Sequence, residues 1–312
     1  MRVLLTCPPM LGMKESFRPL FTAKGIELHC PEVVQTLSED ELIALLPDFD
    51  GWIIGDDPAT RRVFEAGRQG RLKAAVKWGI GVDNVDFAAA MEFGIPIANT
   101  PLMFGREVAD VVMSYVVALA RQTYLIDRAI RAGEWLKPRG ISLAGKTMAL
   151  VGFGDIGKNV SRRALAADMK VIAYDPAVGA NALPLSVASA VWPHRIEEAD
   201  FIVFACSLNP GNRHMLDAPV LGKSKDGVRI VNVSRGPLID EAALIAALQS
   251  KKVHSAALDV FEVEPLPAES PLRAMERCIL GSHNGSNTED AVIRASERAA
   301  QLLFDFLGVA EA

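Results

Sequence analysis

The sequence predicts an α/β protein of two domains, each a doubly wound parallel sheet covered by helices on both faces. Short apolar runs alternate with helix-like stretches along most of the chain, as expected for repeated strand–helix units. A glycine-rich turn near the middle of the chain joins a strand to a helix. The 312 residues are enough to form two separate hydrophobic cores.

The first third of the chain alternates strand and helix signals. Ser38 followed by Glu41 forms a capping box at the start of one helix. The segment Asn99–Pro101 ends the alternation, because a residue before proline avoids helical geometry. The predicted strands are Val3–Cys7, Ile26–Cys30, Trp52–Gly55, Ala74–Trp78 and Pro96–Asn99. The predicted helices are Met13–Lys24, Glu39–Leu46, Thr60–Gln69 and Val85–Phe93.

Strand and helix signals continue after this break, which predicts a second domain inserted into the first. We expect residues 1–99 and 287–312 to form a flavodoxin-like domain, and residues 100–286 to form a Rossmann domain. Further strands are predicted at Met148–Phe153, Val171–Tyr174, Phe201–Cys206, Arg229–Val233, Ala256–Val260 and Cys278–Gly281. Further helices are predicted at Val108–Tyr124, Glu241–Gln249 and Thr288–Phe306.

The glycine turn fits G-x-G-x-x-G, the pattern of dinucleotide-binding proteins. Gly152 permits the tight turn, Gly154 lets the backbone approach a pyrophosphate, and Gly157 lets the helix pack on the strand. Asp155 and Ile156 open that helix, whose free N–H groups and positive dipole end attract phosphate. The alternative is a tight turn that binds no ligand.

An acid at the end of the second strand decides between these two interpretations and between two cofactors. Asp175 follows Gly157 by 18 residues, where a carboxylate can accept hydrogen bonds from a ribose 2′-OH. The same carboxylate would repel a 2′-phosphate. The whole segment therefore predicts that the chain binds NAD rather than NADP.

Composition excludes several partners. A net charge of −5 and the absence of a basic run argue against nucleic acid and anionic membranes. The longest apolar stretch, Val111–Ala120, is shorter than the ~20 residues that cross a bilayer, and the N-terminus does not resemble a signal peptide. The four cysteines lack metal-ligand spacing and are expected to be free thiols, with no metal bound. We expect a cytoplasmic protein.

Five further segments resemble the D-2-hydroxyacid dehydrogenase family, most closely its phosphoglycerate dehydrogenase-like branch. Together they cover nearly the whole chain in the family's order. They are GIGVDNVDFAAA (Gly79–Ala90), NTP (Asn99–Pro101), VNVSRGPLIDEAALIAAL (Val231–Leu248), ALDVFEVEPLP (Ala257–Pro267) and GSHNGSNT (Gly281–Thr288).

This resemblance implies an enzyme that transfers a hydride between NAD and a small D-2-hydroxy acid or 2-keto acid, in a cleft between the two domains. Arg235 matches the residue that holds the substrate carboxylate, for which a guanidinium offers a suitable fork. His283 matches the general acid/base, since histidine titrates near neutral pH. Glu264 matches the carboxylate that pairs with this histidine and orients it.

The resemblance also implies a set of binding residues. Asp259 would meet the nicotinamide carboxamide, and Gly79, Ile80 and Gly81 would bind the substrate carboxylate through backbone N–H groups. Lys77 and Trp78 would line the substrate site, although core packing is an alternative for Trp78. Other expected cofactor contacts are Cys206, Ser207, Val233, Ser234 and Gly285.

Several departures from the family pattern leave the substrate open. Ser282 and Ser207 stand where the family usually has proline. Where phosphoglycerate dehydrogenases typically have an arginine, this chain has Gly55 followed by Asp56 and Asp57, which would repel a phosphate. Lys77 and Arg106 could instead serve a distal anion. The candidate substrates are therefore 3-phosphoglycerate-like acids, hydroxypyruvate and glyoxylate.

Two other functions on the same scaffold are alternatives. Phosphite-type oxidation could use the same arginine and histidine, whereas formate oxidation would not need Glu264. A non-catalytic NAD-sensing protein, similar to corepressors with this fold, could keep all three residues. Family members are mostly dimers, so we expect a homodimer with an interface on the apolar face of Val108–Tyr124, unless that face is buried within one chain.

Overall fold

The computed structural model describes residues 1–309, and their contacts divide the chain into two compact units. Unit 1 comprises Met1–Met103 together with the segment that begins at Asn287, and unit 2 comprises Phe104–Ser286. The chain therefore leaves unit 1, forms unit 2 and returns to complete unit 1.

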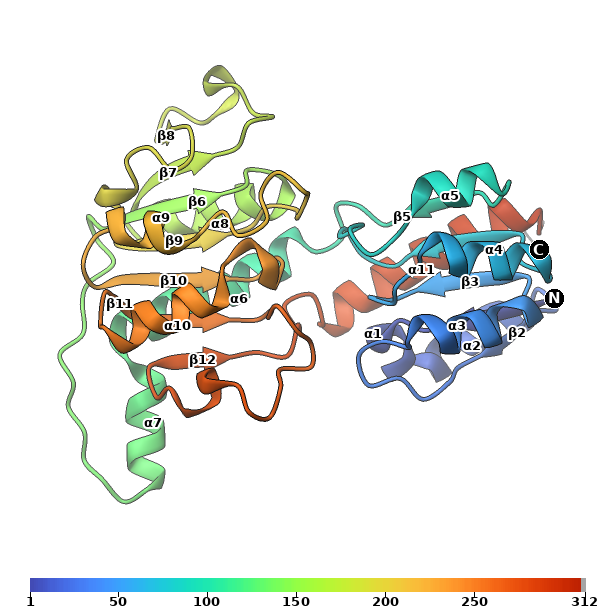
Figure 1. Ribbon diagram of the computed structural model, residues 1–312, viewed down its shortest axis with the longest axis horizontal. Coiled ribbons are helices and arrows are strands. Elements are labelled where there is room, and N and C mark those ends of the chain that lie inside the picture. The colour runs from blue at the N-terminus through green and yellow to red at the C-terminus, as the bar shows by residue number, and fades with distance from the viewer. Residues whose placement is uncertain (310–312) are drawn as a thin grey trace. The chain divides into compact units, whose positions relative to one another are not determined.

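Unit 1 is built on a parallel five-stranded sheet in the order β2-β1-β3-β4-β5 (Figure 1). Strands β3 and β4 are buried throughout and apolar except for Lys77, as is usual for strands covered by helices on both sides. The strands are β1 (Arg2–Leu5), β2 (Glu27–His29), β3 (Gly51–Ile54), β4 (Ala74–Lys77) and β5 (Ile97–Asn99).

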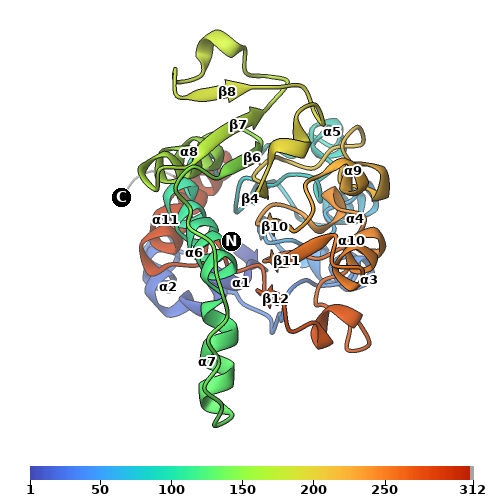
Figure 2. The same cartoon turned by 90° about the vertical axis from the view of Figure 1, so that its left-hand side faces the viewer.

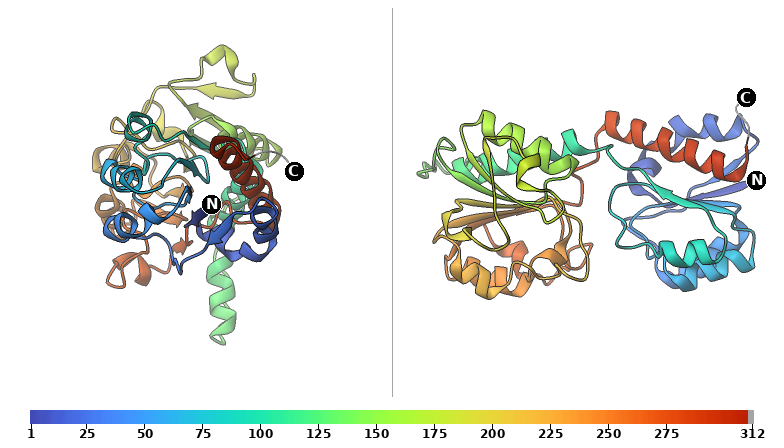
Figure 3. Two further views of the ribbon diagram at one scale, coloured as in Figure 1. Left: turned by 90° about the vertical axis from the view of Figure 1, so that its right-hand side faces the viewer. Right: turned by 90° about the horizontal axis from the view of Figure 1, so that it is seen from above.

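Helices cover both faces of this sheet (Figure 3). The C-terminal helix α11 (Glu289–Leu307) packs on β3, β4 and β5, and completes the core of unit 1. On its side lie α1 (Pro8–Gly12) and α2 (Lys14–Thr22). The other side carries α3 (Glu39–Leu45), α4 (Arg61–Gln69) and α5 (Phe87–Glu92), with the short 3₁₀ helix η1 (Leu46–Asp48).

Unit 2 is built on a parallel seven-stranded sheet in the order β12-β11-β10-β9-β6-β7-β8 (Figure 1). Chain order reverses beside β6, and this is the position at which open α/β sheets bind ligands beyond their strand ends. The strands are β6 (Thr147–Val151), β7 (Lys170–Tyr174), β8 (Val187–Ser189), β9 (Phe201–Phe204), β10 (Val228–Asn232), β11 (Val253–Leu258) and β12 (Cys278–Leu280).

Two pairs of helices flank the unit 2 sheet (Figure 3). On one face α6 (Gly105–Arg121) packs on α8 (Asp155–Ala166), and on the other α9 (Ala218–Lys223) packs on α10 (Glu241–Gln249). A further helix, α7 (Thr123–Arg131), projects away from the sheet (Figure 2). The 3₁₀ helices are η2 (Ala180–Ala182), η3 (Ile196–Glu198), η4 (Gly236–Leu238) and η5 (Pro271–Ala274).

The structure corrects several predicted elements. The helix predicted at Val108–Tyr124 begins at Gly105 and ends at Arg121, because Gln122 takes a left-handed conformation and starts α7. The segment predicted as one helix at Met13–Lys24 is preceded by α1 and ends two residues earlier. Strand β8 and helix α9 were not predicted. Among residues 1–309, no helix has the length and apolar character to cross a membrane.

Candidate functional site

The glycine turn of unit 2 has the shape that its sequence predicts. Gly152 has a φ of 97°, and a Cβ there would lie 2.6 Å from the backbone of Ala205 and Cys206. A Cβ at Gly157 would lie 2.2 Å from the Gly152 carbonyl oxygen, so helix α8 packs against the turn. A Cβ at Gly154 would meet no atom within 4 Å. The backbone therefore faces open space at Gly154.

The start of helix α8 offers its N–H groups to a ligand. Its N-cap, Gly154, has no side chain to accept hydrogen bonds from the first turn. The Asp155 carboxylate lies against Gly105, where a Cβ would approach its oxygens to within 2.5 Å. The side chain of Asp155 is therefore directed toward helix α6. Its backbone, with that of Ile156, forms the first helical turn.

Asp175 is tied to the glycine turn. One of its carboxylate oxygens accepts the Phe153 N–H at 2.7 Å, and the other accepts the Ala177 N–H at 2.9 Å. These bonds fix the carboxylate beside the turn, while the side chain stays half-buried. Its remaining lone pairs can accept hydrogen bonds from a ribose.

Three polar residues from separate segments of unit 2 come together. The Nδ1 atom of His283 lies 2.8 Å from a carboxylate oxygen of Glu264. The other ring nitrogen, Nε2, lies 3.5 Å from Nη1 of Arg235. When Nδ1–H donates to Glu264, Nε2 carries a lone pair that can accept a proton. The structure thus joins the three residues predicted as catalytic.

Backbone bonds hold each member of this group. The second oxygen of Glu264 accepts the Phe261 N–H at 2.9 Å. Arg235 donates from Nη1 to the Ser234 carbonyl oxygen at 2.9 Å. Side chains of Glu264 and His283 are 21% and 22% exposed, so both are largely shielded but can still reach a ligand.

Asp259 supports the loop that carries His283. Its carboxylate accepts the N–H groups of Asn284 at 3.2 Å and Gly285 at 2.8 Å, and its backbone carbonyl accepts the His283 N–H at 2.7 Å. The Tyr115 hydroxyl lies 3.5 Å from the same carboxylate, and burial raises the pKa of this tyrosine. The buried Asp259 charge is thus satisfied mainly by backbone donors.

The remaining predicted cofactor residues lie at the carboxyl ends of β9 and β10. Cys206 follows β9 and borders Gly152, and burial raises the pKa of its thiol to about 12. The Ser207 carbonyl oxygen accepts a bond from Asn212 at 2.8 Å. Val233 and Ser234 follow β10, and the Ser234 N–H donates to the Asn232 side chain at 3.0 Å.

At the carboxyl edge of the unit 1 sheet, the turn after β4 carries the predicted carboxylate-binding residues. Gly79 has a φ of 118°, and its N–H donates to the Thr100 hydroxyl at 2.8 Å. The Gly79 N–H is therefore already bonded within unit 1. The N–H groups of Ile80 and Gly81 have no acceptor among residues 1–309. Thr100 was not predicted to take part, although its place in the Asn99–Pro101 motif is a signal that could have identified it.

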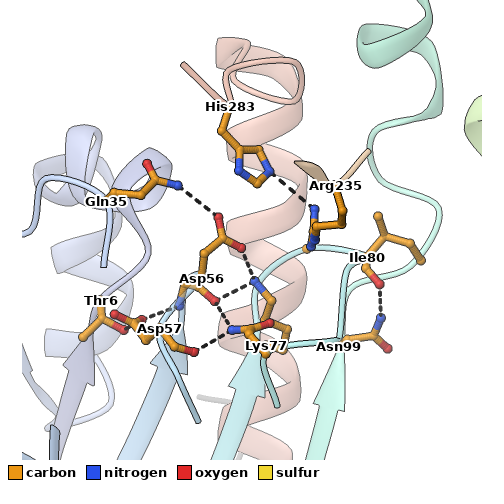
Figure 4. Close-up of polar contacts among 12 residues, drawn as sticks. Thr6, Gln35, Asp56, Asp57, Lys77, Ile80, Asn99, Arg235 and His283 are labelled. Carbon is orange, nitrogen blue, oxygen red and sulfur yellow. Dashed lines mark hydrogen bonds and ion pairs between the residues drawn. The ribbon is translucent and has the colours of Figure 1, made fainter. Parts of the chain in front are cut away.

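Two residues predicted to line the substrate site are buried within unit 1. Trp78 is 5% exposed and donates from Nε1 to the Ser296 hydroxyl of α11 at 3.0 Å, so its side chain belongs to the core. Lys77 is 2% exposed and donates to the Gly55 carbonyl at 2.6 Å and to Asp56 at 3.0 Å (Figure 4).

The structure also bears on metals and thiols. Within residues 1–309, no group of three histidine, cysteine, aspartate or glutamate side chains is arranged to hold a metal ion. The four cysteines are free thiols, and two of them, Cys7 and Cys278, are buried. Burial raises the pKa of Cys278 to about 11, which keeps this thiol protonated at neutral pH.

Comparisons with known proteins agree on one family. Residues 113–285 match the family described as D-isomer specific 2-hydroxyacid dehydrogenase, NAD binding domain. Over 301 residues the chain is 37% identical to a hydroxypyruvate reductase of Thermotoga maritima, covering 95% of this chain and 96% of that protein. It is also 37% identical over 270 residues to a D-3-phosphoglycerate dehydrogenase of Methanocaldococcus jannaschii, covering 83% of this chain but only 50% of that longer protein.

The fold has similar counterparts among solved structures. A glyoxylate reductase from Paecilomyes thermophila superposes with a TM-score of 0.81 at 29% identity, covering 98% of this chain and 95% of that one. The chain thus matches the Thermotoga reductase and this structure over nearly their full lengths, but spans about half of the phosphoglycerate dehydrogenase.

Proposed function

This chain belongs to the D-isomer specific 2-hydroxyacid dehydrogenase family, and on that premise we propose how its own residues perform the reaction. Members of the family are NAD-dependent oxidoreductases that interconvert 2-hydroxy acids and 2-keto acids, and so is this protein. The geometry of unit 2 supports a separate role for the cofactor-binding turn, the histidine and the arginine.

The residues of the glycine turn fit NAD. The open space at Gly154 and the uncapped N–H groups of α8 suit a pyrophosphate, and the fixed carboxylate of Asp175 suits a ribose 2′-OH. Cys206, Ser207, Val233 and Ser234 would border the cofactor from the ends of β9 and β10. When bound, NAD supplies the nicotinamide ring that accepts or returns a hydride.

His283 would move the proton. In the direction of oxidation its Nε2 takes the proton of the substrate hydroxyl while the hydride leaves the adjacent carbon, and in reduction Nε2 returns a proton to the forming alkoxide. Glu264 holds Nδ1 and thereby keeps Nε2 directed at the substrate. This pairing, with a guanidinium 3.5 Å from Nε2, is the observation that carries the proposal.

Arg235 would hold the substrate beside this histidine. A guanidinium can bind a carboxylate and the neighbouring carbonyl oxygen together, which aligns the reacting carbon and polarises the carbonyl for reduction. Its bond to the Ser234 carbonyl restricts the side chain before substrate arrives. In unit 1, the Ile80 and Gly81 N–H groups are donors suited to a carboxylate.

We propose a small D-2-hydroxy acid or 2-keto acid as the substrate, with hydroxypyruvate, glyoxylate and 3-phosphoglycerate-like acids as the candidates. The 37% identity to the Thermotoga hydroxypyruvate reductase over 96% of its length supports related chemistry. We also propose that it is a cytoplasmic homodimer.

Replacing the catalytic histidine tests this assignment. His283→Ala should lower turnover by roughly 10²- to 10⁴-fold and leave NADH affinity nearly unchanged, because the proton acceptor is lost while the glycine turn stays intact. Turnover is measured as NADH consumption with a panel of 2-keto acids, and affinity is measured by fluorescence titration of NADH.

The exposed histidine of the same unit provides the control. His194→Ala removes an imidazole whose side chain is at the surface, and should behave as the parent protein does. Parental turnover in His283→Ala would rule out the proposed role. NADH binding without turnover of any acid by the parent protein would instead favour an NAD-sensing function.

A further inference from the structure

Three charged residues at the carboxyl edge of the unit 1 sheet have no part in the proposed reaction. Asp56 and Asp57 follow β3, and Lys77 is the last residue of β4. Lys77 donates to the Gly55 carbonyl and to Asp56, and its side chain is 3% exposed. The ammonium is therefore compensated inside unit 1 and is covered by protein.

Asp56 lies at the surface of this cluster. Its side chain is 33% exposed. One carboxylate oxygen accepts from Lys77 at 3.0 Å, and the other accepts from the Gln35 side chain at 3.4 Å (Figure 4). These two bonds hold the carboxylate in one orientation, so the group that solvent and ligands meet is the anion and not the buried cation.

Asp57 adds a second carboxylate behind the first. It is fully buried and accepts bonds from Leu37 N–H at 2.9 Å, Gly55 N–H at 3.0 Å and the Thr6 hydroxyl. Burial raises the pKa of this carboxyl, although the three donors oppose the shift. With Asp57 either ionised or neutral, the two carboxyls and the single ammonium carry no net positive charge.

This cluster adjoins the turn to which we assign the substrate carboxylate. A Cβ at Gly79 would lie 3.8 Å from Nζ of Lys77, so the Lys77–Asp56 pair borders the Gly79–Gly81 turn within the same unit. In the arrangement that we infer, a substrate held at this turn has its third carbon beside the Lys77–Asp56 pair, whose exposed member is the Asp56 carboxylate. Like charges in such contact are strongly disfavoured, whereas an uncharged hydroxyl can donate to the same oxygen.

We infer that Asp56 is a specificity-determining residue. It selects 2-keto acids whose third carbon bears an uncharged group and rejects those whose third carbon bears a phosphate. The inference rests on the proposed function, because it takes the Gly79–Gly81 turn as the carboxylate site. Lys77, predicted to serve a distal anion, instead binds and positions Asp56. Hydroxypyruvate fits this selection and its phosphate ester does not, whereas glyoxylate has no third carbon and is not rejected.

The first measurement compares hydroxypyruvate with its phosphate ester on the parent protein. The ratio of kcat/KM values should favour hydroxypyruvate by about 10-fold or more, and should shrink as salt screens the repulsion. Both acids are also titrated into the protein saturated with NAD⁺ and followed by tryptophan fluorescence. That complex cannot reduce them, so the affinity ratio is obtained whether or not either acid is turned over.

The second measurement uses variants. Asp56→Asn keeps the size and an acceptor for Lys77 but removes the repelling charge, and should shift the ratio toward the phosphate ester by about 10-fold. Asp40→Asn removes an equal charge from a residue of unit 1 that is 90% exposed, and should leave the ratio unchanged. Melting temperatures of both variants show whether the fold is retained.

The outcomes separate this inference from the proposed function. Equal or better binding of the phosphate ester by the parent protein would overturn the inference and leave the proposed function standing. A folded Asp56→Asn variant that keeps the parental ratio of kcat/KM values for the two acids would also overturn the inference. Selective binding of hydroxypyruvate without any NADH consumption would support the inference and count against the catalytic assignment. Binding of neither acid would overturn both.

Discussion

The backbone at His283 takes a left-handed conformation with a φ of 55°. A histidine adopts this conformation at a cost in backbone energy. Bonds to Asp259 hold it there: the His283 N–H donates to the Asp259 carbonyl, and the N–H groups of Asn284 and Gly285 donate to the carboxylate. Close packing adds to this, since a Cβ at Gly281 would lie 2.2 Å from the same carboxylate. Asp259 therefore fixes the imidazole through its loop.

This arrangement predicts the effect of changing Asp259. Asp259→Asn replaces one acceptor by an amide donor, which opposes the Asn284 and Gly285 N–H groups and displaces the histidine. We expect kcat to fall by about 10-fold or more, since small displacements of a catalytic group are costly. NADH affinity, from fluorescence titration, should change little. A large loss of NADH affinity with unchanged kcat would instead support contact with the nicotinamide carboxamide.

We expect the choice of cofactor to depend on a single residue. In the proposed cofactor site, Asp175→Ala removes the carboxylate that would accept a ribose hydroxyl and repel a 2′-phosphate. The ratio of kcat/KM with NADPH to that with NADH should rise by about 10-fold or more, because one favourable and one repulsive interaction are lost together. Asp226→Asn, at a side chain that is 92% exposed, serves as the control. An unchanged ratio in Asp175→Ala would contradict the assignment.

Among the helices and strands, local sequence signals identified those that form long periodic or apolar runs and those that begin with a capping motif. Helix α3 begins at Ser38, whose capping box with Glu41 is present in the structure. Strands β1, β3 and β6 were recognisable as buried apolar runs. Strand β8 has three residues and pairs with β7 alone, and α9 has six residues, so neither has enough periodicity to be recognised.

Contacts between residues that are far apart in the chain were harder to predict from the sequence. The meeting of Glu264 with His283 came from family resemblance, because a separation of 19 residues does not itself imply contact. The burial of Trp78 against Ser296 depends on α11 returning from the far end of the chain, over 218 residues. The ion pair of Lys77 with Asp56 likewise depends on how β3 and β4 align.

The capping box of α3 has a pH-dependent effect on stability. Hydrogen bonds from the Ser38 hydroxyl and N–H lower the pKa of Glu41 below its ordinary value of 4.5. A lowered folded-state pKa contributes stability above pH 4.5, and that contribution is lost as the pH falls through the folded value. Glu41→Gln should therefore melt at a lower temperature than the parent at pH 7, and the difference should fade below pH 4.5.

Thermal melts followed by circular dichroism across this pH range measure the effect. Glu65→Gln, at an exposed position on α4, is the matched control and should show no such pH dependence. A difference between Glu41→Gln and the parent that stays constant from pH 7 to pH 3 would show that the ionised carboxylate is not what stabilises the cap.

At the scale of the whole molecule, the predicted dimer interface needs revision. The apolar face of α6 was expected to supply it, but the buried side chains of that helix pack on α8, β10 and β11 within unit 2. Exposed apolar side chains are found instead on α7 and the segment after it. Ile130 is 46%, Trp135 78% and Leu136 42% exposed, on the part of unit 2 that projects from the sheet (Figure 2).

We therefore expect a homodimer to form through α7 and the segment after it, and Trp135 is the residue that tests this. An exposed tryptophan beside other apolar groups is typical of an interface, and removing such a residue commonly costs about 2 kcal/mol or more, which is about 30-fold in affinity. Trp135→Ser should raise the dimer dissociation constant by that factor, measured by sedimentation over a range of concentrations.

Leu185→Ser, at a fully exposed leucine elsewhere in unit 2, is the control and should leave the dimer dissociation constant unchanged. A parent protein that is monomeric at micromolar concentration, or a Trp135→Ser variant as dimeric as the parent, would show that these side chains do not join two copies.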